Sequence, residues 1–263
     1  MHIQALHLTQ PAAARPLSRV WGMVIALLMA GVLLGFGSLA QAAQVVGEVT
    51  LTIGKSNIER SEGQAEPQKG GSVQEGDVIR TSDNGHVHIR FIDGARVSVR
   101  PNSVFRIHEF KYSPADPASS VVRLSLDSGE ARSISGAAAQ AAKERFRLNT
   151  PLVAIGVKGT DFVTQTGHEA TRVTVNQGAI VMAPFDQSCR ADALGVCSSS
   201  RARELTAEMI GMALVYRNGA VDPGFQLAPG QKDASKLQPQ DNQLKDSADR
   251  ATSISKEGVR PED

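Results

Sequence analysis

The residues of this chain best placed for chemistry are two histidines on one face of an expected strand. His86 and His88 alternate with apolar neighbours, which is the period of a strand with one buried face. Two imidazoles at this spacing can hold a metal ion if a third ligand approaches, and His108 and His168 are the candidates. Arg90 shares their face and would repel a cation, and a solvated polar face explains the pattern without a metal. We therefore predict neither a metal site nor a cofactor.

No motif of a catalytic class accompanies the histidines. The sequence contains no G-x-S-x-G, no H-E-x-x-H and no G-x-x-x-x-G-K-[ST]. Residues 156–160 superficially resemble a phosphate loop but lack its spacing and a following helix. Asp93 precedes Gly94 in a pair typical of a two-residue hairpin turn, and the sequence places no second carboxylate beside it. We predict that the chain has no catalytic residues and is not an enzyme.

Cys189 and Cys197 are the only cysteines, and seven residues lie between them. In an oxidising compartment an isolated close pair is most simply a disulfide. Closing so short a loop contributes about 2.5 kcal/mol in the chain-entropy model. A redox pair or half of a metal site is the alternative, for which a C-x-x-C spacing would be typical. We predict a structural disulfide.

The N-terminus indicates export. Arg15 and Arg19 precede an apolar run without any acidic residue before it, and a small-x-small site ends at Ala42. This layout is typical of a signal peptide, so residues 1–42 are expected to be cleaved and the mature chain to be periplasmic or otherwise exported. The alternative is an uncleaved inner-membrane anchor, because the apolar run nearly spans a bilayer. The N-terminal segment is the only membrane contact expected.

Composition limits the partners and the architecture. Of the 263 residues 41% are hydrophobic and 21% are charged, which is enough for one core. A formal net charge of +1 and only 4% aromatic residues provide neither the basic surface nor the stacking platforms that nucleic acids need. Nucleic-acid binding is therefore not expected.

Short alternating runs between turn signals predict the fold that positions these residues. The pattern favours a mainly β protein, with hairpins of short antiparallel strands stacked into a roll or solenoid-like body. One short helix is expected near residues 201–216, where apolar residues recur at helical spacing. Residues 43–231 form this domain. The polar residues 232–263 are expected to be a disordered tail.

Three finer expectations concern the middle of the chain. Residues 54–72 are polar and are expected to be a connecting loop. Residues 121–134 are expected to hold two short strands that meet near residues 127–129. The alanine-rich residues 136–145 are expected to give a turn or two of helix or a mobile loop.

The chain is organised around residues 148–163. Pro151 fixes its own φ and biases Thr150 toward an extended conformation. Branched residues alternate with small ones from residue 153 to residue 157, which is the period of a half-buried strand. Gly159 stands where a bend or a close backbone approach would exclude a side chain. This run is predicted to form a strand, a tight turn and a second strand inside a β-rich core.

The same run resembles a family signature. Thr150-Pro151, followed by Gly156-Val157-Lys158-Gly159-Thr160-Asp161-Phe162, looks like the T-P…V-R-G-T-x-F signature of FecR-type domains, with Lys158 where the family usually has Arg. Further family patterns, V-x-G-x-V, G-D-x-I-x-T, a strand leading into D-G, and a second V-x-G-x-V, follow in the family's order over residues 45–182. The motif positions that this resemblance singles out are Gly76, Asp77, Thr81, Asp93, Gly94, Pro151, Gly159, Thr160 and Phe162.

The resemblance implies an all-β periplasmic domain that works by protein contacts and without catalysis. In FecR-type sensors the domain receives a signal from an outer-membrane transporter and passes it to a cytoplasmic σ factor. Only about nineteen residues precede the apolar segment here, and no second domain is visible after residue 182. Neither the anti-σ domain nor the transporter-contact domain of such sensors is therefore expected.

These observations lead to one functional hypothesis and one alternative. We predict a stand-alone exported FecR-like domain that acts by protein–protein contacts in envelope sensing or signalling. Its partner is an envelope protein that the sequence does not identify, and its ligand-binding residues are unknown. The alternative is a structural protein of the cell envelope, an assembly or surface scaffold.

Overall fold

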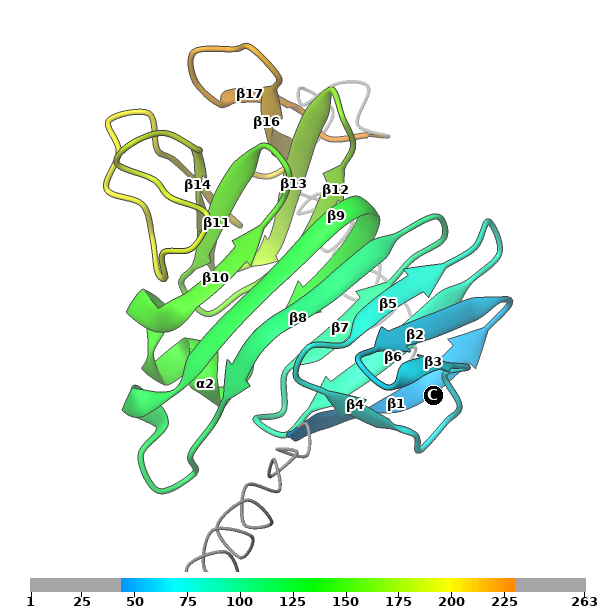
Figure 1. Cartoon of the computed structure of the whole chain (residues 1–263). Coiled ribbons are helices and arrows are strands. Elements are labelled where there is room, and N and C mark those ends of the chain that lie inside the picture. Colours follow the sequence, from blue (N-terminus) through cyan, green and yellow to red (C-terminus); the bar gives the residue numbers. More distant parts are fainter. Residues whose placement is uncertain (1–43, 230–263) are drawn as a thin grey trace, which may run out of the picture. The chain divides into compact units, whose positions relative to one another are not determined.

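A computed structural model describes residues 44–229, which fold into two β-sheet layers that share one strand (Figure 1). The expected signal peptide, residues 1–42, and the expected tail, residues 232–263, lie outside the described residues. Within residues 44–229 no helix is both long and apolar enough to cross a membrane.

The first layer, sheet A, extends from strands of the N-terminal part of the described chain to its last strand. In order of pairing its strands are β4 (Ser72–Gln74), β1 (Val45–Ile53), β6 (His86–Phe91), β7 (Arg96–Val99), the second half of β9 (Val121–Ile134), β12 (Asp161–Thr166), β13 (Ala170–Gln177), β16 (Met212–Arg217) and β17 (Gly224–Leu227).

The second layer, sheet B, has the same kind of order. Its strands are β3 (Gly63–Ala65), β2 (Ser56–Arg60), β5 (Val78–Thr81), β8 (Val104–Lys111), the first half of β9, β10 (Phe146–Asn149), β11 (Val153–Val157), β14 (Ala179–Pro184) and β15 (Arg203–Thr206). The pair β9–β10 is parallel, and the other pairs within residues 44–229 are antiparallel.

Strand β9 joins the two layers. Its 14 residues pair with β8 and β10 in sheet B and then with β7 and β12 in sheet A. The expectation of two short strands here was wrong. The turn signal at residues 127–129 bends the strand without ending it, because Gly129 adopts φ +88° while pairing resumes directly beyond it.

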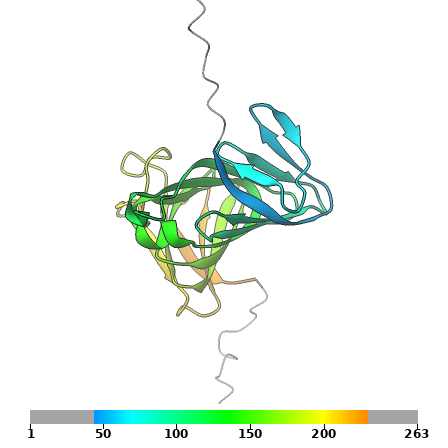
Figure 2. The same ribbon diagram turned by 90° about the horizontal axis from the view of Figure 1, so that it is seen from below.

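From β10 on, successive hairpins alternate between the layers. The hairpin β10–β11 lies in sheet B, β12–β13 in sheet A, β14–β15 in sheet B and β16–β17 in sheet A. Before them, β6–β7 pairs in sheet A and β8–β9 in sheet B. This stacking of hairpins confirms the mainly β fold that the alternating runs predict. In Figure 2 the blue N-terminal strands lie on one side of the body and the yellow and orange C-terminal segments on the other.

The short helix lies elsewhere than expected. The helix predicted at residues 201–216 is absent, because these residues form β15, a turn and most of β16. Gly211 adopts φ +74°, which ends any helical path, and both strands find hydrogen-bond partners in the distant β14 and β13. The α-helix of the described residues is α2 (Ala137–Ala141), within the alanine-rich run expected to turn. It is flanked by the 3₁₀ turns η1 (Pro117–Ser119) and η2 (Lys143–Arg145).

The prediction of a connecting loop at residues 54–72 was also wrong. These residues contain the β2–β3 hairpin and end at the first residue of β4. Both strands are short and largely polar because they lie at the edge of sheet B, where only Ile58 reaches the core. Alternation is too weak in such a hairpin to be recognised from sequence.

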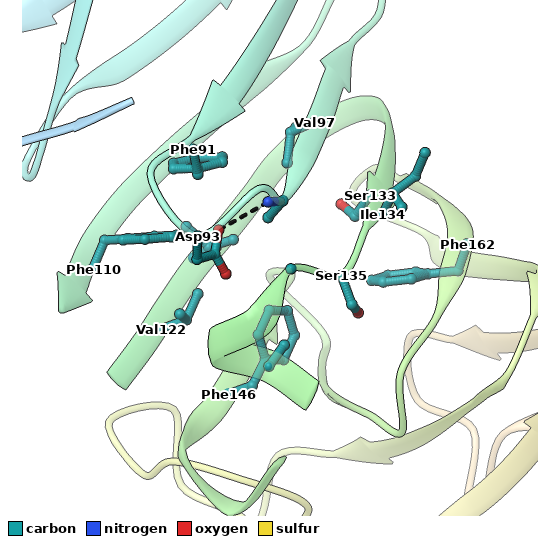
Figure 3. Close-up of a pocket in the computed structure, with 14 residues that line it drawn as sticks. Phe91, Asp93, Val97, Phe110, Val122, Ser133, Ile134, Ser135, Phe146 and Phe162 are labelled. Carbon is teal, nitrogen blue, oxygen red and sulfur yellow. Dashed lines mark hydrogen bonds between the residues drawn. The ribbon is translucent and has the colours of Figure 1, made fainter. Parts of the chain in front are cut away.

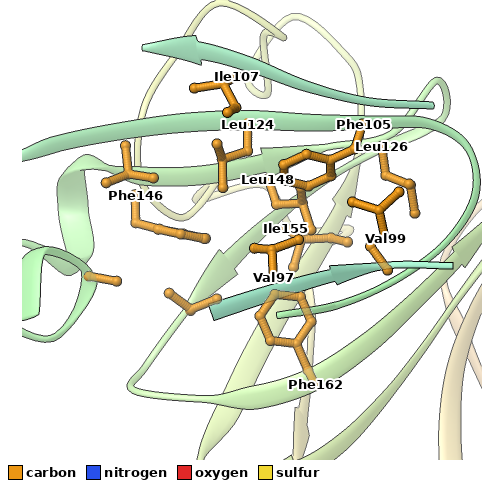
Figure 4. Close-up of a cluster of buried hydrophobic side chains, with 14 of the residues drawn as sticks. Val97, Val99, Phe105, Ile107, Leu124, Leu126, Phe146, Leu148, Ile155 and Phe162 are labelled. Carbon is orange, nitrogen blue, oxygen red and sulfur yellow. The ribbon is translucent and has the colours of Figure 1, made fainter. Parts of the chain in front are cut away.

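Branched and aromatic side chains from both layers fill the space between them (Figure 4). Strands β7 to β12 supply the centre of this core with Val97, Val99, Phe105, Ile107, Leu124, Leu126, Phe146, Leu148, Ile155 and Phe162. Strand β11 is buried on both of its faces, whereas the sequence predicts a half-buried strand. Its second face is covered by the segment that contains the two cysteines.

Candidate functional site

A cleft of about 510 Å³ lies on the outer side of sheet B, beside the cysteine-containing segment. Strands β8, β9 and β10 and the segment after β14 contribute its walls. Its lining residues are His108, Arg123, Ser125, Asp127, Asn149, Thr150, Pro151, Phe185, Ala191 and Asp192. The cleft therefore contains the Thr150-Pro151 pair of the family signature and one of the histidines considered as a metal ligand.

The cleft contains a serine, a histidine and an aspartate in hydrogen-bond contact, but their order does not suit nucleophilic catalysis. The Ser125 hydroxyl donates to Asp127 Oδ1 at 2.7 Å, and its Oγ lies 3.0 Å from His108 Nε2. Because the serine proton is given to the aspartate, His108 Nε2 donates to the serine oxygen and does not accept from it. Catalytic serines need the opposite arrangement, with the imidazole accepting the hydroxyl proton.

The electrostatics of the cleft agree with a neutral His108. Burial lowers the pKa of His108, the neighbouring Arg123 and Arg106 lower it further, and Asp127 opposes them. Arg123 and Asp127 themselves form ion pairs, with Glu109 at 3.8 Å and with Arg106 at 3.3 Å. The cleft is thus a polar surface with mixed charge.

The structure separates the histidines that a metal site would have to unite. His86 and His88 lie on β6 in sheet A, whereas His108 lies on β8 in sheet B. Burial lowers the pKa of His88, as do His86 and Arg100. Among the described residues no group of three or more His, Cys, Asp or Glu side chains is placed to hold a metal ion.

The Asp93 carboxylate stabilises two segments, the hairpin turn that the Asp-Gly pair predicts and the start of α2, a contact that the sequence does not predict. It lies beside a core cavity of about 20 Å³, among Phe91, Phe110 and Phe146 (Figure 3). Its Oδ1 accepts a hydrogen bond from the Ala95 N–H at 2.9 Å, as the hairpin turn requires. Its Oδ2 accepts from the Ala138 N–H at 3.2 Å and so holds the start of α2 against the turn. Burial raises the pKa of Asp93, and these N–H groups partly offset that effect.

The other early motif positions also stabilise turns. Gly76 adopts φ +90° in the turn between β4 and β5. Asp77 is buried and pairs with Arg60, whose Nε lies 2.9 Å from Asp77 Oδ1. Thr81 Oγ1 donates to the Arg100 carbonyl at 2.6 Å and accepts from the Ser103 N–H at 2.9 Å. Gly94 completes the β6–β7 turn with φ +83°.

The organising stretch carries the chain from one sheet to the other. Strand β11 lies in sheet B and β12 in sheet A, and Gly159 turns between them with φ +69°. Thr160 is buried and its N–H donates to Ser135 Oγ at 3.1 Å, while Phe162 enters the core. The expected strand, turn and strand is confirmed. Lys158, the departure from the family pattern, binds Glu204 on the surface at 2.9 Å.

The disulfide expected from sequence is present between Cys189 and Cys197, whose Cα atoms are 5.2 Å apart. Arg147 lies under it and is the functional-site candidate that sequence reasoning missed. Its neighbours Phe146 and Leu148 point into the core, so alternation places Arg147 on the outer face, where a solvated arginine is expected. Only the covering segment, some forty residues later, buries it.

Exposed apolar side chains gather at the two ends of sheet A. Among the described residues the large hydrophobic side chains between 40% and 77% exposed are Val45, Leu51, Ile53, Ile92, Ile210, Val221, Phe225 and Leu227. The first three belong to β1, and Ile92 donates its N–H to the Val46 carbonyl beside them. The last four belong to the β16–β17 hairpin and the turns around it.

With this geometry established, a comparison with protein families is decisive for one part of the chain. The model of the FecR protein family matches residues 77–181. These residues form a FecR domain. The domain begins at β5 and ends within β14, and it includes every motif position singled out above except Gly76, which directly precedes it. The family resemblance was expected over residues 45–182, so the match is shorter at its N-terminal end. It leaves out β1 to β4, although these strands belong to the two sheets.

Solved structures resemble the chain only in part. Two crystal structures of a Parabacteroides distasonis protein, described provisionally as an anti-sigma factor, are 14% and 16% identical to it, with TM-scores of 0.39. Each likeness covers 59% of this chain and 61% of that protein. A structure described as a cell surface anchoring domain is 24% identical over 23% of this chain and 82% of its own, with a TM-score of 0.23. No curated protein matches the chain.

Proposed function

We propose that this chain is a non-catalytic FecR-domain protein of the cell envelope that acts by binding another envelope protein in sensing or signalling. The observation that carries the proposal is the concentration of exposed apolar side chains at the edges of sheet A. Exposed apolar patches on a folded protein mark contact surfaces, and edge strands recruit extended segments of partners through their free backbone groups.

The C-terminal edge is the better docking surface of the two. Within the described residues β17 pairs only with β16, so its other side offers free N–H and C=O groups. Phe225 lies opposite the buried Leu214 and therefore on the core side of the sheet, where sheet B no longer covers it. The strand contains no charge and no proline, the usual protections of an edge.

The same observation also favours a second function, an envelope scaffold. The N-terminal edge is free as well, because β4 pairs with only the first part of β1 and leaves Leu51 and Ile53 exposed. Two different apolar edges on one molecule permit head-to-tail association of copies, which does not close by symmetry. A scaffold would use both edges, whereas a sensing subunit needs one.

Site-specific photo-cross-linking in intact cells separates these functions. The cross-linking residue replaces Leu227 at one edge, Leu51 at the other, or the exposed Arg96 in the middle of sheet A as a control. We expect position 227 to capture one envelope protein other than this chain, and Phe225→Asp to abolish capture without lowering the unfolding temperature. Position 96 should capture nothing.

The outcomes are distinct in the mass spectrum of the captured peptides. Cross-links between position 51 of one copy and the β16–β17 hairpin of another would replace the sensing role by the scaffold. Equal capture at positions 96 and 227 would reject both edge-based functions. The N-terminal peptide of the same material tests export, which predicts Ala43 as the first residue.

A further inference from the structure

Arg147 is a fully buried cation without a charged partner. Its side chain is 1% exposed and lies between β10 and the segment that carries the cysteines. Nη1 lies 3.1 Å from Cys197 Sγ and 3.9 Å from Cys189 Sγ, and Nη2 donates to the Leu194 carbonyl at 3.1 Å. Nε has no hydrogen-bond partner among the described residues, and no carboxylate there forms an ion pair with this guanidinium.

This environment is unfavourable for the oxidised protein. Burial lowers the pKa of the Arg147 guanidinium, yet an arginine remains charged at neutral pH. A buried charge is costly unless an opposite charge accompanies it, and a disulfide has none to offer. A thiolate at the same place would be the missing anion, and cations lower the pKa of neighbouring thiols.

We propose that Cys189 and Cys197 form a redox site that accepts two electrons from a dithiol, and that Arg147 stabilises the reduced state through an ion pair with the Cys197 thiolate. The site belongs to the thiol–disulfide exchange class. It is independent of the docking edges proposed above, since it lies on the opposite layer and uses none of their residues.

The charges around the two sulfurs differ and select Cys197 as the thiolate. Arg147 Nη1 is closer to Cys197 than to Cys189. Asp186 stands on the Cys189 side, where the two backbones exchange hydrogen bonds of 3.2 Å. The Ser188 hydroxyl and N–H lower the pKa of Asp186, so this residue stays ionised and supplies no cation on the Cys189 side. The remaining charged groups of the segment are paired on its outer side, Arg190 with Asp192 and Arg201 with Asp186.

The exchange balances with the dithiol as the reductant. One donor thiolate attacks Cys189 Sγ, a mixed disulfide forms, the Cys189–Cys197 bond breaks, and its electron pair leaves on Cys197 beside Arg147. The proton that this first donor thiol lost on becoming a thiolate has passed to solvent. The second donor thiol then attacks the donor sulfur of the mixed disulfide, Cys189 leaves and takes the proton of that second thiol, and the donor becomes a disulfide.

The redox state is connected to the cleft on sheet B. Both sulfurs are buried, so the covering segment has to open for the donor to reach them. This segment is held by Arg147 at Leu194 and by Asn149, whose Nδ2 donates to the Ala191 carbonyl at 2.7 Å. Ala191 and Asp192 also line the cleft. Reduction thus changes one wall of the cleft as well as the sulfurs.

The equilibrium constant of reduction tests the proposal on the full chain. The protein is incubated in buffers with defined ratios of reduced to oxidised dithiothreitol, and free thiols are alkylated and counted by mass spectrometry. We expect Arg147→Met to require at least about tenfold more reductant than wild type for half reduction, which is about 30 mV for two electrons. Arg190→Met, which removes an exposed arginine of the same segment, should leave the constant unchanged. Equal constants for wild type and Arg147→Met would overturn the proposal.

A second measurement does not depend on the stability of an Arg147 variant. In Cys189→Ser the remaining Cys197 is alkylated at a series of pH values, and in Cys197→Ser the remaining Cys189 is treated in the same way. We expect Cys197 to react as a thiolate well below the ordinary thiol pKa of about 8.5, and Cys189 not to do so. If Cys197 titrates like an ordinary thiol, Arg147 is a packing residue and the disulfide is structural only.

Discussion

Buried charges in this protein are balanced in three different ways. Asp77 is paired directly with Arg60. Asp93 receives only backbone N–H groups, from Ala95 and Ala138. Arg147 donates only to a carbonyl oxygen and to sulfur. The charge of Asp77 is therefore paired. The charge of Asp93 has no counter-charge within residues 44–229 and would be neutralised by a proton. The charge of Arg147 has none there either and would be paired by a cysteine thiolate.

Asp93 gives a prediction about pH. Burial raises its pKa in the folded protein, so the folded state holds the proton more tightly than the unfolded chain. The stability gained from that proton is fully present below the unfolded value of about 3.9 and is lost as pH rises through the raised folded value. Asp93→Asn stays uncharged throughout. Urea unfolding should therefore show wild type losing stability relative to this variant as pH rises above about 4. A difference that is constant with pH would contradict this.

At the scale of elements the bend in β9 decides how the two layers connect. Gly129 combines a positive φ with close neighbours, since a Cβ there would lie 2.5 Å from Ser103 Cα and 2.6 Å from the Asn102 carbonyl oxygen. Both atoms are backbone atoms that cannot rotate away. Only glycine therefore fits at the point where the strand passes from sheet B to sheet A.

The substitutions Gly129→Ala and Gly219→Ala distinguish the free-energy cost of a positive φ from the cost of a steric clash. Gly219 has φ +81° and open space around it, so its substitution should cost about 1 kcal/mol for the positive φ alone. Gly129 has φ +88° and the clash as well, so its substitution should cost about 2 to 4 kcal/mol. Chemical denaturation of both variants measures the difference. Equal losses would mean that β9 shifts to accommodate the methyl group.

At the scale of the whole molecule the shared strand makes one cooperative unit of the two layers. The described residues 44–229 belong to one compact unit, and one hydrophobic cluster extends from Val46 in β1 to Tyr216 in β16. The FecR domain at residues 77–181 lies within this cluster and has no separate core. Its flanking strands are therefore expected to be necessary for its stability.

The two tyrosines report on this cooperativity. Tyr112 follows β8 and Tyr216 lies in β16, and the chain contains no other tyrosine. When both are replaced by fluorotyrosine, their folded fluorine NMR signals should disappear with one common urea midpoint, because no boundary between cores separates them. Two distinct midpoints would show that the C-terminal strands unfold separately from the FecR domain.

Sequence reasoning succeeded where a few adjacent residues decide the conformation. Asp93-Gly94 predicts a hairpin because Gly94 supplies the positive φ of its turn, although three residues (92–94), and not the expected two, connect Phe91 with its partner Ala95. Residues 86–91 predict β6 because alternation is local. It failed at residues 201–216, where apolar spacing fits a helix and two strands equally well and distant partners select the strands. It also failed at β9, since a turn signal does not reveal whether pairing continues beyond it.

The sequence by itself determined the β class, the order of the family motifs and the pairing of the only two cysteines, because dihedral preferences, alternation and residue identity are properties of short segments. Only the tertiary structure decided which sheet each strand joins and what covers its outer face. Arg147 and Cys197 are 50 residues apart in the chain and 3.1 Å apart in the fold. The energy of a charge depends on its surroundings, and distant segments of the chain supply those surroundings.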